Sequence, residues 1–242
     1  MQPYDLDAAM DQLPQCPDPL YPDGSGFHLT ITVAGPATAI ISLGTLPSLS
    51  EQIEWKLAPL PGQLDHSADL TLVLWSDECF EGLVNLLALD GPRLGIIVMH
   101  HRDQQVPSII GGHHLLRLSY AASPITELLQ VVQMLAVPLL FRSVICVDYL
   151  DLAFMLARGG RLRMFGPFSL DCRSTHWTKP LHSLVREQDM YALILLPDSD
   201  PRERRFSQAA NELAKLDPDL LLIAAHFHRG EEAALWILAV DR

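Results

Sequence analysis

The chain has 242 residues, of which 49% are hydrophobic and 19% are charged, so it can bury a sizeable core and is not a disordered tail. Its 29 acidic residues outnumber 17 Lys and Arg, which gives a net charge of −12 with histidine neutral. That balance argues against a broad DNA- or RNA-binding surface, because phosphate contacts need clustered Lys and Arg. It also argues against electrostatic binding to an anionic membrane.

The N-terminal sequence MQPYDLDAAMDQLPQ has neither a basic region nor an apolar core, and it therefore predicts no signal peptide. The longest charge-free apolar stretch near the middle of the chain, residues 128–141, is shorter than the roughly 20 residues that a membrane-spanning helix needs. The four cysteines are far apart and form no CxxC motif, which suits reduced thiols. We therefore expect a soluble, cytoplasmic protein with no integral membrane segment.

Residues 1–26 differ from the rest of the chain. They contain five prolines and five aspartates, and the first Lys or Arg of the chain is Lys56. This composition predicts an extended, acidic, proline-rich N-terminal arm. Three roles stay open for it: a loosely ordered terminus, a segment that packs on the body, and a segment that binds a partner.

From residue 27 the pattern is that of an α/β fold. Apolar strands are predicted at 27–34, 68–74, 94–99 and 114–119, and a helix at 79–88 with Phe80, Leu83, Val84 and Leu87 on its apolar face. Buried strands that alternate with helices indicate a mostly parallel sheet with both faces covered. We assign residues 27–122 to this first, Rossmann-like domain.

The second half begins with a helix that is apolar nearly all round. Ser123 is its predicted N-cap, Pro124 its first residue and Pro138 its end. A second helix is predicted from Asp148 to the glycines at 159–160, followed by strands at 161–165, 191–197, 220–227 and 233–240 and a helix at 206–216. We expect residues 123–242 to form a central helix and a smaller mixed α/β domain with a four-stranded sheet.

Two junctions between a strand and a loop could hold a phosphate group, at residues 32–38 (TVAGPAT) and 75–82 (WSDECFEG). The first has one glycine and a proline that removes an amide donor. In the second, Ser76 can cap the helix, while Asp77 and Glu78 already occupy its positive end and would repel a triphosphate. Neither GxxxxGK[ST] nor GxGxxG occurs, and we expect no nucleotide cofactor.

The histidine pairs at 100–101, 113–114 and 226/228 have no metal-ligand spacing, and no nucleophile elbow (GxSxG) is present. We therefore assign no metal ligand and no catalytic residue.

The acids of CVDYLD (146–151) have two interpretations. Asp148 stands where an N-cap belongs and Asp151 stands three residues later, so both favour the start of a helix. Alternatively, the two carboxylates project from a loop and polarise water in the site of another molecule.

The order of these features resembles the FtsZ/tubulin superfamily, which includes the bacterial cell-division GTPases. Residues 137–166 are similar to the end of the family's central helix, its catalytic loop (Asn-x-Asp-Phe-x-Asp), the next helix and a strand that ends in Met-x-Gly. TKPL (178–181) resembles the family's Ser-Pro-Leu segment, and QAANEL (208–213) lies in a tail that looks like the end of its C-terminal domain. The resemblance implies that Asp148 and Asp151 are the loop acids, which insert into the next subunit, and that Cys146 replaces the usual Asn.

The first domain departs from the family. Where the family has multi-glycine phosphate loops, this chain has residues 32–37 and 68–83, and acids replace the tubulin signature. The resemblance thus implies a non-catalytic, pseudo-GTPase interaction protein with an interface at Cys146, Asp148 and Asp151. Its expected partner is a protein, either an FtsZ-type filament or a second copy of the chain. Two alternatives stay open: a small-molecule hydrolase or transferase that uses these acids in an interdomain cleft, and a divergent GTP-binding filament protein.

Overall fold

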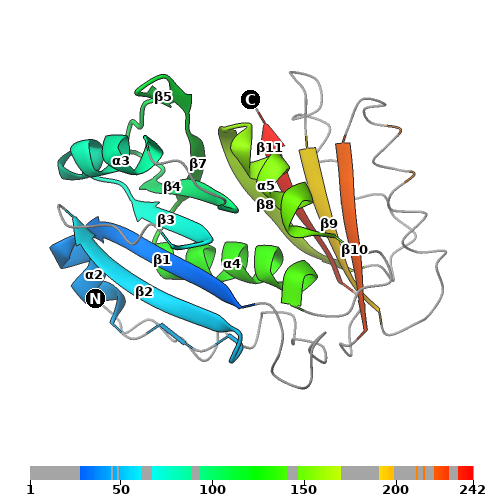
Figure 1. The fold of residues 1–242 in the computed structure, drawn as a ribbon. Helices are drawn as coiled ribbons and strands as arrows, with labels where there is room; N and C mark the ends of the chain where they lie inside the picture. Colours follow the sequence, from blue (N-terminus) through cyan, green and yellow to red (C-terminus); the bar gives the residue numbers. More distant parts are fainter. Residues whose placement is uncertain are drawn as a thin grey trace.

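The architecture is mixed α/β and is built on one large sheet (Figure 1). The computed structural model describes residues 28–44, 46–47, 49–60, 67–88, 93–140, 147–169, 191–198, 211, 215, 221–228 and 234–241. Within these residues nine strands form one sheet in the order β10-β9-β11-β8-β7-β4-β3-β1-β2, and β5 and β6 form a separate hairpin. The predicted arm at 1–26 lies outside the described residues, as does nearly all of the predicted helix at 206–216.

Five parallel strands make up the first half of the sheet. They are β1 (Leu29–Pro36), β2 (Ile53–Leu60), β3 (Leu70–Leu74), β4 (Gly95–His101) and β7 (Leu116–Tyr120). Four of them confirm predicted strands. The edge strand β2 was not predicted, because Lys56 and Pro59 interrupt its apolar pattern, and both residues are tolerated at the edge of a sheet.

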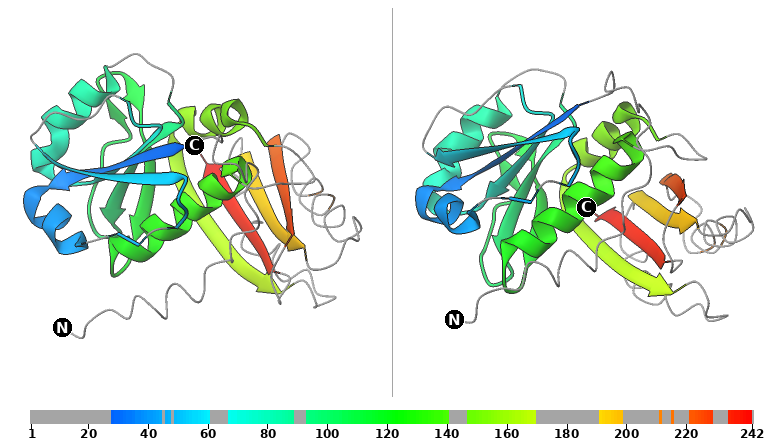
Figure 2. Two further views of the ribbon diagram at one scale, coloured as in Figure 1. Left: turned by 60° about the horizontal axis from the view of Figure 1, so that its bottom comes forward. Right: turned by 90° about the horizontal axis from the view of Figure 1, so that it is seen from below.

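Helices cover the two faces of these strands (Figures 1 and 2). On one face α2 (Ala37–Leu43), α4 (Pro124–Leu140) and α5 (Tyr149–Ala157) share a core with the strands. On the other face α3 (Phe80–Leu87) and the hairpin of β5 (Ile109–Ile110) and β6 (His113–His114) bury a second cluster.

The apolar face predicted for α3 is confirmed at Leu83, which is buried, and at Val84 and Leu87, which pack against the same cluster. Phe80 is exposed, contrary to the prediction, and Leu86 is buried instead. The predicted start of the helix at Cys79 was one residue early, because a 3₁₀ turn at Asp77–Cys79 precedes the α-helix.

The C-terminal strands form the mixed group that the sequence predicted. They are β8 (Gly160–Ser169), β9 (Tyr191–Asp198), β10 (Leu221–His228) and β11 (Ala234–Asp241). Strand β11 lies between β8 and β9 and is antiparallel to both, whereas β9 and β10 are parallel.

The two groups of strands are not separate sheets. Strand β8 pairs in parallel with β7 through Leu116↔Gly160, Arg117↔Arg161 and Leu118↔Leu162. The prediction of one sheet packed on another across a helix misses this connection, because strand pairing between distant segments leaves no local signal. The domain boundary near residue 122 stays a prediction.

Helix α4 packs against both groups of strands. It contacts β4 of the first group and β11 of the second. The Oγ atom of Ser123 accepts a hydrogen bond from the backbone N–H of Ile125 at 3.3 Å, as expected for a cap. The prediction that Pro138 ends the helix was wrong, because α4 continues to Leu140. Proline removes one backbone donor, but Leu139 and Leu140 beyond it are buried in the core, and their burial offsets that loss.

None of the helices among the described residues is long and apolar enough to cross a lipid bilayer.

The burial of α4 gives a stability prediction. Leu129 is 1% exposed, so Leu129→Ala should lower the free energy of unfolding by about 2–5 kcal/mol. Ile41→Ala is the control, because Ile41 is 77% exposed and its truncation should change stability by less than about 0.5 kcal/mol. Urea unfolding measures both. Equal effects of the two substitutions would contradict the central position of α4.

Candidate functional site

The two acids predicted as site residues form a capping box at the start of α5. The Oδ1 atom of Asp148 accepts the backbone N–H of Asp151 at 2.8 Å, and the Oδ2 atom of Asp151 accepts the backbone N–H of Asp148 at 3.2 Å. The capping interpretation is therefore confirmed. Both residues are exposed, and capping uses one oxygen of each carboxylate. The third predicted residue, Cys146, lies outside the described residues.

Two large apolar side chains are exposed beside these acids. Leu150 is 74% exposed and Phe154, one turn further along α5, is 51% exposed, while Leu152, Met155 and Leu156 on the other side of the helix are buried. The guanidinium carbon of Arg158 lies 4.7 Å from the centroid of the Phe154 ring. We call Asp148, Leu150, Asp151 and Phe154 the α5 surface. The sequence did not single out Leu150 and Phe154, because α5 is apolar on most sides and periodicity does not tell which side is covered.

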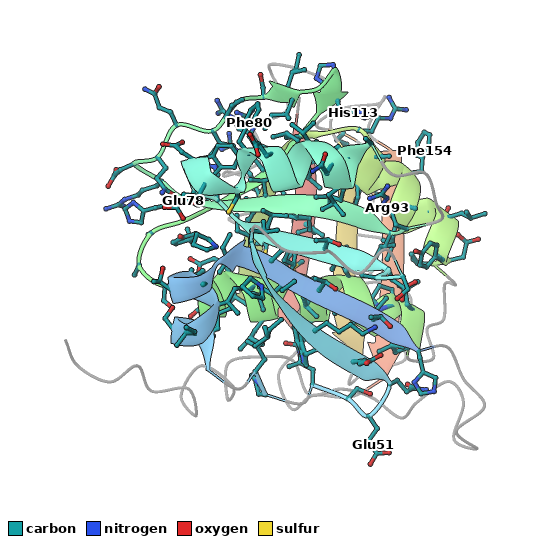
Figure 3. The ribbon with its side chains drawn as sticks, turned by 60° about the vertical axis from the view of Figure 1, so that its left-hand side comes forward. Glu51, Glu78, Phe80, Arg93, His113 and Phe154 are labelled. Carbon is teal, nitrogen blue, oxygen red and sulfur yellow. The ribbon has the colours of Figure 1, made fainter. Side chains whose placement is uncertain are left out.

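A cavity of about 630 Å³ adjoins the α5 surface. Leu150 and Phe154 line it together with residues of α3, β4 and the β5–β6 hairpin, and Figure 3 shows Phe154 on the same side of the molecule as Arg93 and His113, which also line it. Neither Asp148 nor Asp151 is among the lining residues that the structure describes. The cavity therefore offers an apolar contact surface, and it does not provide the cleft that acid–base catalysis by the two aspartates would need.

Hydrogen bonds hold the start of α5 at the amino-terminal edge of the parallel strands. The hydroxyl of Tyr149 donates to Oδ1 of Asp69 at 3.4 Å, and Asp69 in turn accepts the backbone N–H of Thr30 on its Oδ2 atom at 2.8 Å. Burial, with a further contribution from the nearby Asp69 carboxylate, raises the pKa of Tyr149 to about 12. These bonds fix the α5 surface relative to β1 and β3.

The end of α5 is equally constrained. Gly159 has a φ of +67°, and a Cβ atom there would lie 2.7 Å from the Cβ atom of His114. Only glycine satisfies both the left-handed backbone and this close approach. The predicted helix end at residues 159–160 is thus confirmed, and it sends the chain directly into β8.

The two candidate phosphate loops lie at the opposite, carboxyl edge of the strands. Pro36, the last residue of β1, stands at the N-cap position of α2 without a side-chain capping hydrogen bond, and a Cβ atom at Gly35 would lie 2.9 Å from the Cβ atom of Leu74. Gly35 therefore serves the close approach of the neighbouring strands β1 and β3. Because the acids of α5 and these loops are at opposite edges, one copy of the chain cannot bring them together in one site.

The loop after β3 presents negative charge. Asp77 and Glu78 are exposed in the first turn after Ser76 (Figure 3 labels Glu78). The expectation that Ser76 caps this helix is wrong. Its side chain makes no capping hydrogen bond, and its Oγ atom lies 3.3 Å from the Sγ atom of Cys79. The positive end of this short helix is thus met by carboxylates, which disfavours an anionic ligand there.

Across the described part of the chain, no three His, Cys, Asp or Glu side chains are grouped so that they could hold a metal ion.

Comparison with known proteins gives a fold. Over 99% of this chain and 93% of the other, the structure matches an empty FtsZ dimer from M. jannaschii with a TM-score of 0.55 at 10% sequence identity. The W319Y mutant of the same FtsZ matches over 92% and 93% of the two chains, with a TM-score of 0.51 at 10% identity. The chain has an FtsZ/tubulin-like fold.

A GDP-form protofilament of TubZ from Bacillus thuringiensis serovar israelensis is also similar, with a TM-score of 0.48 at 8% identity over 99% of this chain and 88% of that one. No protein-family model and no curated protein matches the sequence. The recognition made from the residues around Asp148 and Asp151 is thus confirmed at the level of the FtsZ/tubulin-like fold.

The Tyr149–Asp69 hydrogen bond predicts a pH dependence. The pKa of Tyr149 is about 12 in the folded chain against an ordinary value of 10.0, so its contribution to stability is fully present below pH 10 and is lost as pH rises toward 12. In the variant Tyr149→Phe, the side chain at this position has no hydroxyl group and cannot ionise. The difference in unfolding free energy between wild type and Tyr149→Phe, measured by urea unfolding, should therefore shrink between pH 9 and pH 12. A difference that is constant over this range would contradict the assignment.

Proposed function

We propose that the chain is a non-catalytic, FtsZ-like interaction protein that binds a protein partner end to end through the α5 surface. The observation that carries the proposal is the exposure of Leu150 and Phe154 beside two acids. They lie at the edge of the sheet opposite the loops that follow β1 and β3. Exposed apolar side chains grouped with charges are typical of a protein contact. The resemblance of the loop to the family's inter-subunit loop supports the same surface.

Charge favours a partner other than a second copy. A head-to-tail contact between two copies would bring Asp148 and Asp151 toward the opposite edge of the next copy, where Asp77 and Glu78 are exposed. Each pair of carboxylates held about 6 Å apart costs about 1–3 kcal/mol at dielectric constants between about 80 and 20. We therefore propose that the chain regulates or caps a filament of the FtsZ type in the cytoplasm of a dividing bacterial cell, and self-association is the competing possibility.

The α5 surface is tested by substitutions that leave the fold intact. Asn caps about as well as Asp, so the double variant Asp148→Asn/Asp151→Asn should lose only a few tenths of a kcal/mol of stability. It should nevertheless bind polymers of an FtsZ-type protein from the same cell at least about tenfold more weakly, because the loss of charge complementarity slows association with the partner. Co-sedimentation measures binding, and thermal unfolding measures stability.

Two further variants complete this test. Leu150→Ser/Phe154→Ser should abolish co-sedimentation, since exposed apolar anchors contribute most of the binding energy of a contact. Glu51→Gln/Glu54→Gln removes the same charge as the aspartate variant but lies at the start of the edge strand β2, five places from β8 in the strand order, and it should bind normally. If all three variants bind like wild type, the α5 surface is not the contact. If wild type forms dimers or polymers by sedimentation velocity instead, self-association replaces the proposed partner.

Loss of nucleotide binding is a separate prediction. The acids at 77–78 and the single glycine of the β1 loop disfavour a triphosphate at this edge of the sheet, so calorimetry should show that Mg·GTP binds no more tightly than inorganic tripolyphosphate. Guanosine-selective binding with a dissociation constant at or below about 10 μM, roughly −7 kcal/mol, would support the divergent GTP-binding alternative.

A further inference from the structure

Strands β4, β7 and β8 carry a row of basic side chains on one face of the sheet (Figure 1 shows the three strands side by side). Arg117 of β7 is paired in register with Val98 of β4 on one side and with Arg161 of β8 on the other. Val98 packs in the cluster that α3 and the hairpin cover, so Arg117 and Arg161 share that face. Because side chains alternate along a strand, His100, Ser119 and Arg163 lie on it too.

The other face of the same strands is entirely different. Leu116, Leu118 and Leu162 are buried there in the core with α4 and α5. On the basic face, by contrast, Arg117 and Arg163 are half-buried, and Arg161 is exposed and has Asp241 of β11 as its cross-strand partner in register. In the part of the chain that the structure describes, this contrast is the pattern of a sheet with one face packed and one face without a covering helix.

The open face is hollowed into a cavity of about 630 Å³. Its described lining includes Arg102, Arg117, Arg161, Arg163 and His100, and none of the described lining residues is Asp or Glu. The Nη1 atom of Arg117 donates to the backbone carbonyl of Val106 at 3.2 Å, which holds this guanidinium against the cavity wall. Four of the chain's 17 Lys and Arg are thus gathered at one place in a molecule whose net charge is −12.

Such a cluster selects a particular chemistry. A guanidinium presents a planar fork of donors that matches the oxygens of a phosphate group, and several forks around one cavity match a ligand with several such groups. Neutral Gln104, Gln105 and Ser119 supply further donors.

We propose that this cavity binds a small ligand that carries two or more phosphate groups. The cavity shares no described lining residue with the cavity beside the α5 surface, whereas Gln105 and Val106 of its wall also line a hollow next to Asp77 of the loop after β3. It recognises the phosphate groups alone, so a nucleoside triphosphate enters it no better than an inorganic chain of three phosphates. This proposal does not depend on the proposed function, and the two can fail independently.

The test is calorimetric titration of the full chain with inorganic tripolyphosphate and, separately, with inorganic phosphate at physiological ionic strength. Tripolyphosphate should bind at least about tenfold more tightly than phosphate, because charge-assisted hydrogen bonds to more than one group add together. Arg161→Gln/Arg163→Gln should weaken tripolyphosphate binding at least about tenfold for the same reason. Arg158→Gln removes a positive charge on α5 and should leave it unchanged.

A second variant keeps the test decisive if the glutamine pair unfolds. Arg161→Lys/Arg163→Lys retains both charges but loses the planar donor geometry of both guanidinium groups. It should bind tripolyphosphate with an affinity between that of wild type and that of Arg161→Gln/Arg163→Gln. Thermal unfolding confirms which variants are folded. Equal affinity for tripolyphosphate and phosphate, or an equal loss in Arg158→Gln, would overturn the proposal. Tripolyphosphate binding that survives in folded Arg161→Gln/Arg163→Gln would do the same.

Discussion

The burial of α4 is the constraint on which the rest of the structure depends. Its apolar residues point in nearly every direction, and Leu128, Val132 and Leu135 are completely buried. A helix of this kind is stable in water only when other elements surround it. Strands β4 and β11, which are far apart in the sequence, both contact it, and the pairing of β7 with β8 closes the sheet between them. The continuous sheet is thus the consequence of one helix that needs cover along its whole length.

That arrangement also decides where the chemistry-bearing residues lie. The chain leaves α4, passes through residues 141–146 and starts α5 at the amino-terminal edge of the parallel strands, where Tyr149 and Asp69 hold it. The loops that follow β1 and β3 are at the other, carboxyl edge of these strands. An intramolecular active site made from the α5 acids and those loops is excluded by this separation, whereas a contact between the two ends of different molecules is compatible with it.

The same fold leaves one face of β7 and β8 without a covering helix among the described residues, and the sequence there changes from leucine to arginine. An open sheet face needs polar side chains, but lysine, glutamine or threonine would satisfy that need as well. The gathering of arginines in a strongly acidic chain is therefore more than solvation requires, and it gives the molecule a cavity lined by four of them.

Much of this protein was determined by its sequence alone. Alternating strands and helices predicted the α/β class, Asp148 and Asp151 predicted their own capping box, and the glycines at 159–160 predicted the end of α5, since each depends on local backbone chemistry. Only the tertiary structure decided that the sheet is continuous and that α4 continues past Pro138. It also decided that Leu150 and Phe154 are exposed and that Arg102, Arg117, Arg161 and Arg163 line one cavity. These features depend on which distant segments lie side by side, and periodicity along a chain carries no information about that.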